Sequence, residues 1–384
     1  MSDNTFKTPF GAFKLQRLPR NKAEQLRAWD AADEYLLNML YENKLNLGKT
    51  LICNDAFGAL SVALHSNHPI NWSDSSLAHK ALRKNLAANE LDKKSVICLD
   101  SLSSPTTEVN LVLIKIPKTL ALLEDQLIRL RPKLTQNTKI LLAGMAKHMP
   151  SSIWKLLERI VGPTTTSLAL KKARVIEVQY DAELPLPANP YPVSWKLEKT
   201  DIELSNHANV FAREKLDIGT RFLMEHLPQT EGDGDIIDLG CGNGVLGLMA
   251  ARQNPLLKVH FVDESYMAVA SARKNFIQVV EQEADISDRA QFHVAGGLNN
   301  FEDNSVDMVL CNPPFHQHQT VGDSTAKAMF RQAARVLLPG GELWVVGNQH
   351  MGYHQRLRRE FDRVNLVASN RKFVILKATN LIEE

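Results

Sequence analysis

One apolar run of the sequence is followed directly by an asparagine, two prolines and an aromatic residue. The run ends at Cys311, and the next residues are Asn312-Pro313-Pro314-Phe315. Proline lacks an N–H and ends a ladder of hydrogen bonds, so we expect Asn312 at the mouth of a strand. The Asn312 amide oxygen, the Pro313 carbonyl and the Phe315 ring can together grip a flat group that carries an exocyclic NH2. A core position for Phe315 and a simple strand stop are the alternatives.

A loop of three glycines follows another predicted strand. The strand covers residues 235–239, the loop contains Gly240, Gly242 and Gly244, and a helix is predicted from about Val245. Between a strand and a helix, glycines let a ligand approach the backbone closely. A tight turn without a ligand is the alternative.

An acidic residue ends the next predicted strand. Residues 259–262 are apolar or aromatic apart from one histidine, and Asp263 follows them. Its carboxylate can accept hydrogen bonds from both hydroxyls of a ribose, as acidic residues do in dinucleotide-binding folds. A helix N-cap ahead of Ser265, or a solvated strand end, is the alternative.

Strands and helices that alternate along the chain must position these residues. Such alternation predicts the α/β class, with mostly parallel sheets and crossover helices. The first half has helical spacing over residues 22–45, and its predicted strands lie near residues 49–53, 95–99, 109–114 and 139–142. The second half has predicted strands near residues 235–239, 259–262, 291–294, 306–311 and 342–346, and then a hairpin of residues 364–368 and 373–376.

Short sequences recur in the same order in the two halves. Arg83-Lys84-Asn85 matches Arg273-Lys274-Asn275, and residues 109–113 match residues 306–310. Several matches in one order indicate an internal duplication, which predicts two tandem domains of one Rossmann-like fold. The first copy has a single glycine in place of the glycine loop, and Lys115-Ile116-Pro117-Lys118 in place of the Asn-Pro-Pro-Phe segment. We interpret the first copy as a binding module that has lost the site.

The net charge of +2 conceals a difference between the halves. Residues 1–200 contain 27 Lys and Arg against 19 Asp and Glu, whereas residues 201–384 contain 18 against 24. Residues 111–175 alone contain twelve basic and three acidic residues. A solvated face is the ordinary explanation for such a block, but a basic module beside a site for a flat amine favours a nucleic-acid surface. We therefore predict that Lys115 and Lys118 bind RNA.

Composition and length set the remaining limits. With 384 residues, of which 44% are hydrophobic and 23% charged, we expect a globular protein of two domains. Four prolines within Asp181–Pro192 predict a linker there, between domains 1–180 and 193–384. No apolar run has membrane-spanning length and the first residues lack signal-peptide features, so we expect a cytoplasmic location and no membrane partner. The four cysteines have no metal-ligand spacing and are expected to be reduced thiols.

The order of glycine loop, strand-end acid and Asn-Pro-Pro-Phe resembles class I S-adenosylmethionine-dependent methyltransferases that act on nitrogen. The resemblance covers roughly residues 204–377. It implies that Gly240, Gly242 and Gly244 line the methionine part of the cofactor, that Asp238 orients the loop, and that Asp263 holds the ribose. Residues 295–297 lack the acidic residue or Asn that many relatives have near the adenine.

A degenerate domain fused ahead of an Asn-Pro-Pro-Phe domain is similar to the bacterial ribosomal RNA guanine-N2 methyltransferases, and most similar to the large-subunit (23S) type. Residues 209–220 resemble that family's approach to the first strand, and His316 resembles its residue after the motif. The resemblance implies methyl transfer from S-adenosylmethionine to the N2 of a guanine in 23S ribosomal RNA, with His316 facing the RNA.

The chemistry implied is an in-line displacement by an amine whose lone pair is delocalised. Asn312 and Pro313 would accept its two N–H groups, Phe315 would stack on the base, and no metal is expected, although His316 and His318 are close in sequence. An adenine-N6 methyltransferase and a protein-glutamine methyltransferase share the Asn-Pro-Pro motif and remain alternatives. A non-catalytic RNA-binding or ribosome-assembly protein is the alternative from a different class.

Overall fold

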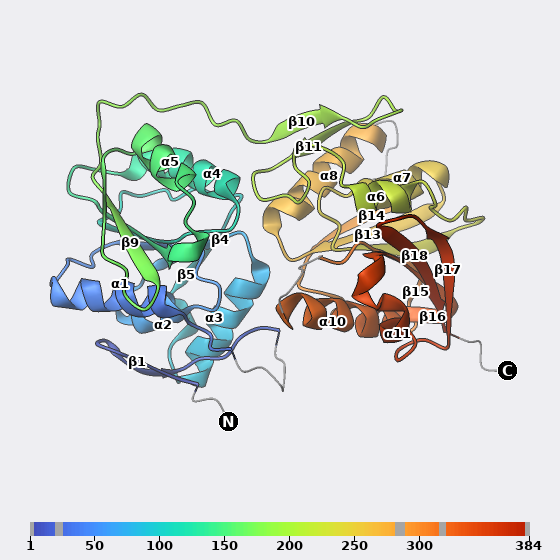
Figure 1. Ribbon diagram of the computed structural model, residues 1–384, viewed down its shortest axis with the longest axis horizontal. Coiled ribbons are helices and arrows are strands. Elements are labelled where there is room, and N and C mark those ends of the chain that lie inside the picture. The colour runs from blue at the N-terminus through green and yellow to red at the C-terminus, as the bar shows by residue number, and fades with distance from the viewer. Residues whose placement is uncertain (1–3, 20–25, 281–288, 315–319, 381–384) are drawn as a thin grey trace. The chain divides into compact units, whose positions relative to one another are not determined.

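The structure is a computed structural model that describes residues 4–19, 26–280, 289–314 and 320–380. Internal contacts divide the chain into two compact units, Met1–Tyr191 and Pro192–Glu384. Each unit consists of a short antiparallel hairpin and a seven-stranded sheet with helices on both faces (Figure 1). Among the described residues, none of the helices combines the length and the apolar character needed to cross a membrane.

The first unit contains nine strands and five α-helices among its described residues. The hairpin of β1 and β2 precedes a sheet with the strand order β5-β4-β3-β6-β7-β9-β8. The elements in chain order are β1 (Thr5–Thr8), β2 (Gly11–Lys14), α1 (Ala31–Glu42), β3 (Thr50–Cys53), α2 (Ala59–Ala63), β4 (Ile70–Ser73), α3 (Ser76–Ala88), β5 (Ile97–Asp100), β6 (Leu111–Lys115), α4 (Leu120–Leu130), β7 (Lys139–Met145), α5 (Ser152–Ile160), β8 (Thr164–Thr166) and β9 (Ala173–Val178).

The second unit repeats this scheme. The hairpin of β10 and β11 precedes a sheet with the strand order β14-β13-β12-β15-β16-β18-β17. The elements in chain order are β10 (Val193–Lys196), β11 (Glu203–Asn206), α6 (Ile218–Met224), β12 (Gly234–Leu239), α7 (Val245–Gln253), β13 (Leu257–Asp263), α8 (Tyr266–Val280), β14 (Ala290–Val294), β15 (Val306–Cys311), α10 (Thr320–Val336), β16 (Leu337–Asn348), α11 (Tyr353–Leu357), β17 (Arg363–Ser369) and β18 (Phe373–Thr379).

The two sheets have the same topology. In each, the first five strands of the order pair in parallel and the last two are added antiparallel. Chain order and space order therefore correspond strand by strand, with β3 matching β12 and β6 matching β15. The predicted fold class, two tandem Rossmann-like domains with mostly parallel sheets, is confirmed.

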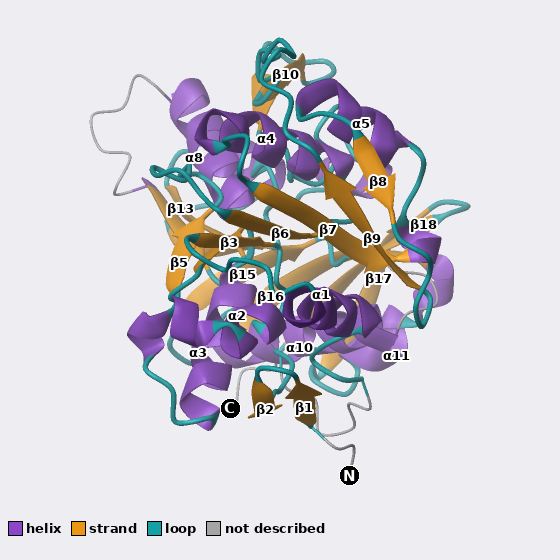
Figure 2. Cartoon of the chain, turned by 90° about the vertical axis from the view of Figure 1, so that its left-hand side faces the viewer, coloured by secondary structure: helices purple, strands orange, loops and turns teal. Residues whose placement is uncertain are grey.

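Alternate residues of the central strands enter two separate cores, because successive side chains of a strand point to opposite faces. In the first unit, Ile52 packs on the side of α1, α2 and α3, and Leu51 packs on the side of α4 and α5. Figure 2 shows these two helix layers on either side of the sheet. In the second unit, Ile236 faces the core with α6, α7 and α8, and Ile237 faces the core with α10 and α11.

The asparagine of each repeated tripeptide joins the hairpin of its unit to the loop after the first sheet strand. The Asn85 side chain accepts from the Gln16 N–H at 2.9 Å and donates to the Phe57 carbonyl at 2.8 Å. The Asn275 side chain accepts from the Ser205 N–H at 2.7 Å and donates to the Asn243 carbonyl at 3.0 Å. The repeated residues are thus equivalent in space, and the duplication includes the hairpins.

We expect Asn275→Ala to lower the free energy of unfolding of the second unit by about 2–4 kcal/mol, because it removes hydrogen-bond partners from two backbone groups at a fully buried position. Urea unfolding of the full chain measures the change. Lys274→Ala, at the exposed neighbouring position, is the matched control and should stay within about 0.5 kcal/mol of the wild type. Equal stability of Asn275→Ala and Lys274→Ala would contradict the role of Asn275.

Candidate active site

The carboxyl ends of three adjacent parallel strands carry the predicted site residues. Leu239 of β12 pairs in register with Val262 of β13 and with Cys311 of β15. The residues that follow these three positions therefore leave the sheet at one edge, which places the glycine loop between Asp263 and Asn312. Ligands of open α/β sheets bind outside the carboxyl ends of the strands.

The glycine loop uses backbone conformations that favour glycine. Gly240, Gly242 and Gly244 have φ angles of +73°, +55° and +79°. The N–H groups of Gly240 and Cys241 donate to the Val262 carbonyl at 2.8 and 3.1 Å, which fixes the start of the loop to β13. The loop then turns directly into α7, with Gly244 in the left-handed conformation as its N-cap.

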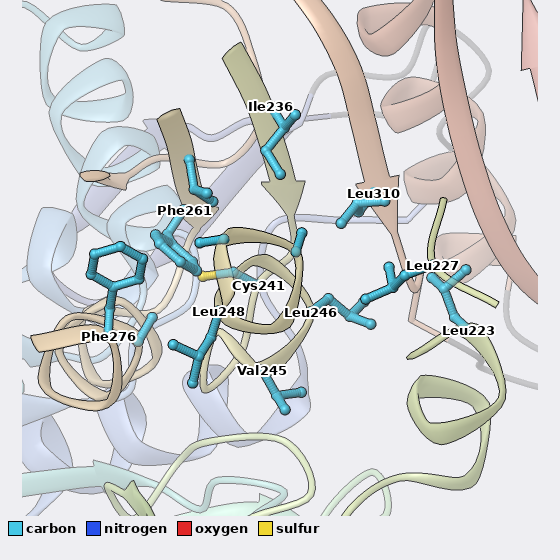
Figure 3. Packing of buried hydrophobic residues seen from close by; sticks show 14 of the residues in the cluster. Leu223, Leu227, Ile236, Cys241, Val245, Leu246, Leu248, Phe261, Phe276 and Leu310 are labelled. Carbon is cyan, nitrogen blue, oxygen red and sulfur yellow. The ribbon is translucent and has the colours of Figure 1, made fainter. Parts of the chain in front are cut away.

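Two of these glycines differ in what surrounds them. A Cβ on Gly244 would lie 2.8 Å from the Cβ of Ala272, so this glycine lets α7 and α8 approach closely. A Cβ on Gly242 would meet nothing within 4 Å, which leaves open space over the loop. Below the loop, Cys241 is buried in the core that contains Phe261 (Figure 3). The loop is therefore packed on its inner side and open on its outer side.

The Asp238 carboxylate lies beneath the loop and holds α7. Its Oδ2 accepts from the Gly247 N–H at 2.9 Å, and the residue is 1% exposed. Burial raises the pKa of Asp238 to about 7, and the nearby charge of Asp263 acts in the same direction, against the Gly247 hydrogen bond. The contact ties the first turn of α7 to the end of β12.

The Asp263 carboxylate fastens the other side of the loop. Its Oδ2 accepts from the Gly242 N–H at 3.0 Å, and its Oδ1 accepts from the Ser265 N–H at 3.0 Å. The second contact fixes the turn ahead of α8, where Ser265 and not Asp263 caps the helix, since the Ser265 hydroxyl accepts from the Ala268 N–H at 3.0 Å. The first contact places the carboxylate against the open glycine of the loop. The predicted ribose contact stays a prediction.

The Asn312 side-chain amide is held on one side only. Its Nδ2 donates to Thr220 Oγ1 at 2.8 Å and to Asp217 Oδ2 at 3.2 Å. Its Oδ1 is buried and has no hydrogen-bond partner among the described residues. An unpaired buried carbonyl oxygen costs free energy unless a ligand supplies a donor. Asn312 therefore presents an acceptor that fits an amine.

The rest of the Asn-Pro-Pro-Phe segment is described in part. Pro313 is buried and Pro314 is exposed. Phe315, His316 and His318 lie outside the described residues, so their predicted roles stay predictions. Within the described ranges, no group of three or more His, Cys, Asp or Glu side chains is placed to hold a metal ion.

The first unit has an ion pair where the second has Asn312. Registers of the sheets make Lys115 equivalent to Asn312, as the repeat predicted. The Lys115 ammonium donates to Asp30 at 2.8 Å and to Asp33 at 2.7 Å. Burial acts to lower the pKa of Lys115, but attraction by Asp33 and Asp30 outweighs it and raises the pKa. This geometry assigns Lys115 an internal structural contact; its predicted RNA contact remains untested.

The space over the first unit's loop is small. A cavity of about 120 Å³ lies there, between Asn54, Asp55, Phe57 and Lys115. Ligand pockets typically have volumes of roughly 300–1,000 Å³. Asp55 is buried and accepts from the Ser61 N–H and hydroxyl at 2.9 and 2.8 Å. Asp55 thus makes to α2 the kind of contact that Asp238 makes to α7, and its carboxylate is engaged within the first unit.

Half of the basic block that favoured a nucleic-acid surface is engaged within the first unit. Five members pair with carboxylates and Arg131 donates to backbone carbonyls. Those five are Lys115, Arg129, Lys139, Arg159 and Lys171. Five other members are exposed, and these are Lys118, Lys147, Lys155, Lys172 and Arg174. The exposed members carry the charge that is available to a polyanion.

Sequence reasoning missed the partners of Asn312. Asp217 is the N-cap of α6, and its Oδ2 accepts from the Thr220 N–H at 2.9 Å. In the sequence both residues are merely part of the segment that leads to the first sheet strand. Aspartate is a residue type that favours the N-cap position, which is compatible with the start of α6. It does not predict the contact with Asn312, which lies 95 residues away from Asp217.

The fold and the loop at the ends of β12 and β15 are those of a methyltransferase-like α/β protein. The family model described as RLMG N-terminal domain matches residues 3–182, and the model described as Methyltransferase small domain matches residues 201–377. Relatives with the name ribosomal RNA large subunit methyltransferase G match nearly the whole chain. Those of Pseudomonas aeruginosa and Streptomyces coelicolor are 50% and 47% identical, each with 97% of this chain and 99% of the relative covered. The chain belongs to the ribosomal RNA large subunit methyltransferase G family, which confirms the resemblance.

A solved structure shares the complete two-unit fold. It is the T. thermophilus 16S rRNA N2 G1207 methyltransferase in complex with AdoMet and guanosine. The TM-score is 0.76 and the sequence identity 19%, with 98% of this chain and 97% of that chain covered. At this identity the likeness concerns the fold alone.

We expect Asp238→Asn to gain stability relative to the wild type as the pH rises from 4 to 8. With a folded pKa near 7 against about 4 in the unfolded chain, wild-type Asp238 binds its proton more tightly when folded. Its ionisation therefore lowers the free energy of unfolding through this range, by roughly 1–4 kcal/mol. Asparagine stays neutral and can still accept from Gly247. Urea unfolding at several pH values measures the difference, and a difference that does not change with pH would exclude the buried titration.

Proposed function

We propose that the second unit transfers a methyl group from S-adenosylmethionine to the exocyclic N2 of a guanine in 23S ribosomal RNA. The observation that carries this proposal is the buried Oδ1 of Asn312, an acceptor without a partner among the described residues. The names of the relatives support a large-subunit rRNA substrate. The structural neighbour, a 16S rRNA N2 G1207 methyltransferase in complex with AdoMet and guanosine, supports the choice of cofactor and of acceptor atom.

The glycine loop fits S-adenosylmethionine. Gly242 faces open space, so a ligand can contact the backbone there. Gly240, Gly242 and Gly244 would line the methionine part of the cofactor, and Asp263, at the open glycine, would hold the ribose hydroxyls. When bound, S-adenosylmethionine supplies a methyl group on a positively charged sulfur, which needs no metal to react.

The residues at the end of β15 would prepare the amine. A guanine N2 amine is a weak nucleophile because its lone pair is delocalised into the ring. Acceptance of its two N–H groups by Asn312 Oδ1 and the Pro313 carbonyl would favour a pyramidal nitrogen with its lone pair aimed at the methyl group. The new N–C bond forms as the S–C bond breaks and sulfur keeps the electron pair. The amine loses its extra proton afterwards, so no general base is required for the transfer.

Residues outside the described ranges complete this proposal. Phe315 would stack on the target base, which must leave its helix to reach the site. His316 would face the RNA beside it. The first unit would bind RNA through exposed basic residues such as Lys118. A ribosomal RNA substrate supports a cytoplasmic location for the protein.

Asn312→Ala should lower kcat by about 10²–10³-fold, because it removes the acceptor that positions the amine. Transfer from labelled S-adenosylmethionine to ribosomal RNA, followed by digestion to nucleosides, measures both the rate and the product. Affinity for RNA and for S-adenosylmethionine should change little. The control Asn370→Ala alters an asparagine of the β17–β18 turn and should keep wild-type kcat.

The chemical identity of the labelled product distinguishes the proposed function from its alternatives. Label recovered as N2-methylguanosine supports the proposal. Label recovered only as N6-methyladenosine, or only as methylglutamine in protein substrates, overturns it. A wild-type protein that binds RNA and no S-adenosylmethionine is a binding or assembly factor.

Lys118→Glu should weaken RNA binding and reduce the slope of log affinity against log salt by about 1, because one phosphate contact is lost. Filter binding of rRNA fragments at several salt concentrations measures both quantities. Lys94→Glu makes the same charge change at an exposed lysine outside the basic block and serves as the control. If both variants lose affinity equally, Lys118 has no specific contact.

A further inference from the structure

Asp217 and Thr220 hold the Asn312 amide, although the proposed methyl transfer assigns no role to either residue. We propose that Asp217 and Thr220 are positioning residues that fix the orientation of the Asn312 amide, so that Oδ1 is held toward the substrate amine. This inference rests on the proposed function. It assigns to α6 a part in the methyl transfer, although neither of the two residues belongs to the Asn-Pro-Pro-Phe motif.

The hydrogen bonds permit one orientation of the amide. Asp217 Oδ2 accepts from the Thr220 N–H at 2.9 Å and lies 3.4 Å from the Thr220 hydroxyl, which donates to it. Thr220 Oγ1 is thereby left as an acceptor, and it receives Asn312 Nδ2 at 2.8 Å. A carboxylate only accepts hydrogen bonds. A flipped amide would direct Oδ1 at Asp217, which cannot donate and would repel it, and the Thr220 hydroxyl would have to leave Asp217 in order to donate to Oδ1.

The charge of Asp217 also strengthens the acceptor. Hydrogen bonds in a chain polarise one another, and this effect is larger where water is excluded. When the amide N–H groups of Asn312 point at a carboxylate, electron density moves toward Oδ1. That oxygen is buried, so water does not screen the effect. Asp217 therefore makes Asn312 a better acceptor for the amine as well as an oriented one.

The first unit contains the same link without the acceptor. Asp30 is the N-cap of α1 and Asp33 is the third residue after it, as Asp217 and Thr220 are for α6. Lys115 donates to both. In both units, a hydrogen bond thus joins the end of the strand to the N-terminus of the helix and helps to hold the fold. An ammonium has three donors and no acceptor, so only the second unit offers an acceptor to a substrate amine.

Substitutions that keep the helix cap separate positioning from folding. Asp217→Ser retains an N-cap side chain for the Thr220 N–H, but its hydroxyl is too short to reach Asn312. Thr220→Val has nearly the same shape as threonine and lacks the hydroxyl. Both should lower kcat by roughly 10–10³-fold, with wild-type affinity for S-adenosylmethionine in calorimetry. Thr220→Ser keeps the hydroxyl and should restore most of the activity. Asp217→Asn keeps an acceptor for Asn312 without the charge, so it should restore the orientation and part of the activity.

A double-mutant cycle tests whether these residues act through Asn312. If they do, Thr220→Val should cost nothing further in an Asn312→Ala background, because the oriented oxygen is already absent. A purely structural role predicts that the two losses multiply. Asp30→Ser makes the matched change at the N-cap of α1 and should leave kcat at saturating RNA unchanged.

The outcomes separate this inference from the proposed function. A wild-type protein that does not methylate guanine in rRNA overturns the proposed function. Wild-type activity that Asn312→Ala abolishes, together with wild-type kcat in Asp217→Ser and Thr220→Val, overturns the inference alone. Multiplicative losses in the cycle also overturn it. Reduced kcat in both variants, rescue by the conservative changes and no added cost in the double variant support it.

Discussion

Both units depend on one hydrogen bond at the edge of the sheet. A side-chain donor at the end of β15 or β6 binds the N-cap residue of α6 or α1. In the second unit the donor is the Asn312 amide, and in the first it is the Lys115 ammonium. Parallel strands bring their carboxyl ends to one edge, where each chain segment leaves the sheet with unpaired backbone groups. The donor closes that edge against α6 or α1. Beside it, the outer side of the glycine loop stays open at Gly242.

Comparison of the two copies separates the residues that hold the fold from the residues that could bind a ligand. Asn85 and Asn275 make the same two contacts, and Gly58 and Gly244 begin equivalent helices with φ angles of +80° and +79°. These residues hold the fold, and both copies retain them. The open glycine, the strand-end acid and the amide acceptor are the residues for which we propose ligand contacts, and the first copy has replaced all three. What differs between two copies of one fold therefore marks the site more sharply than either copy does alone.

Much of the fold follows from patterns in the sequence. The parts of the fold that the sequence does not predict lack a local pattern. The strand Ile70–Ser73 was missed because its four residues, which include Asn71, show neither alternation nor a long apolar run. Of the helix predicted over residues 22–45, residues 22–25 lie outside the described residues. From residue 26 onward the helix begins at Ala31, where Asp30 and Asp33 form a capping box. The positions of the glycine loop and of Asn312 were predictable because local motifs specify them. Contacts such as that of Asn312 with Asp217 depend on tertiary structure, and no local pattern encodes them.

The ion pair of Lys115 has an evolutionary consequence. A single change of Lys115 to asparagine would give the first unit the amide that the second unit has at Asn312. It would also leave Asp30 and the buried Asp33 without their cation. A buried carboxylate that loses its partner is strongly destabilising. An amide acceptor in the first unit would thus require changes at the strand end and at the helix together. The ion pair therefore protects the first unit against a one-step conversion to the arrangement of the second.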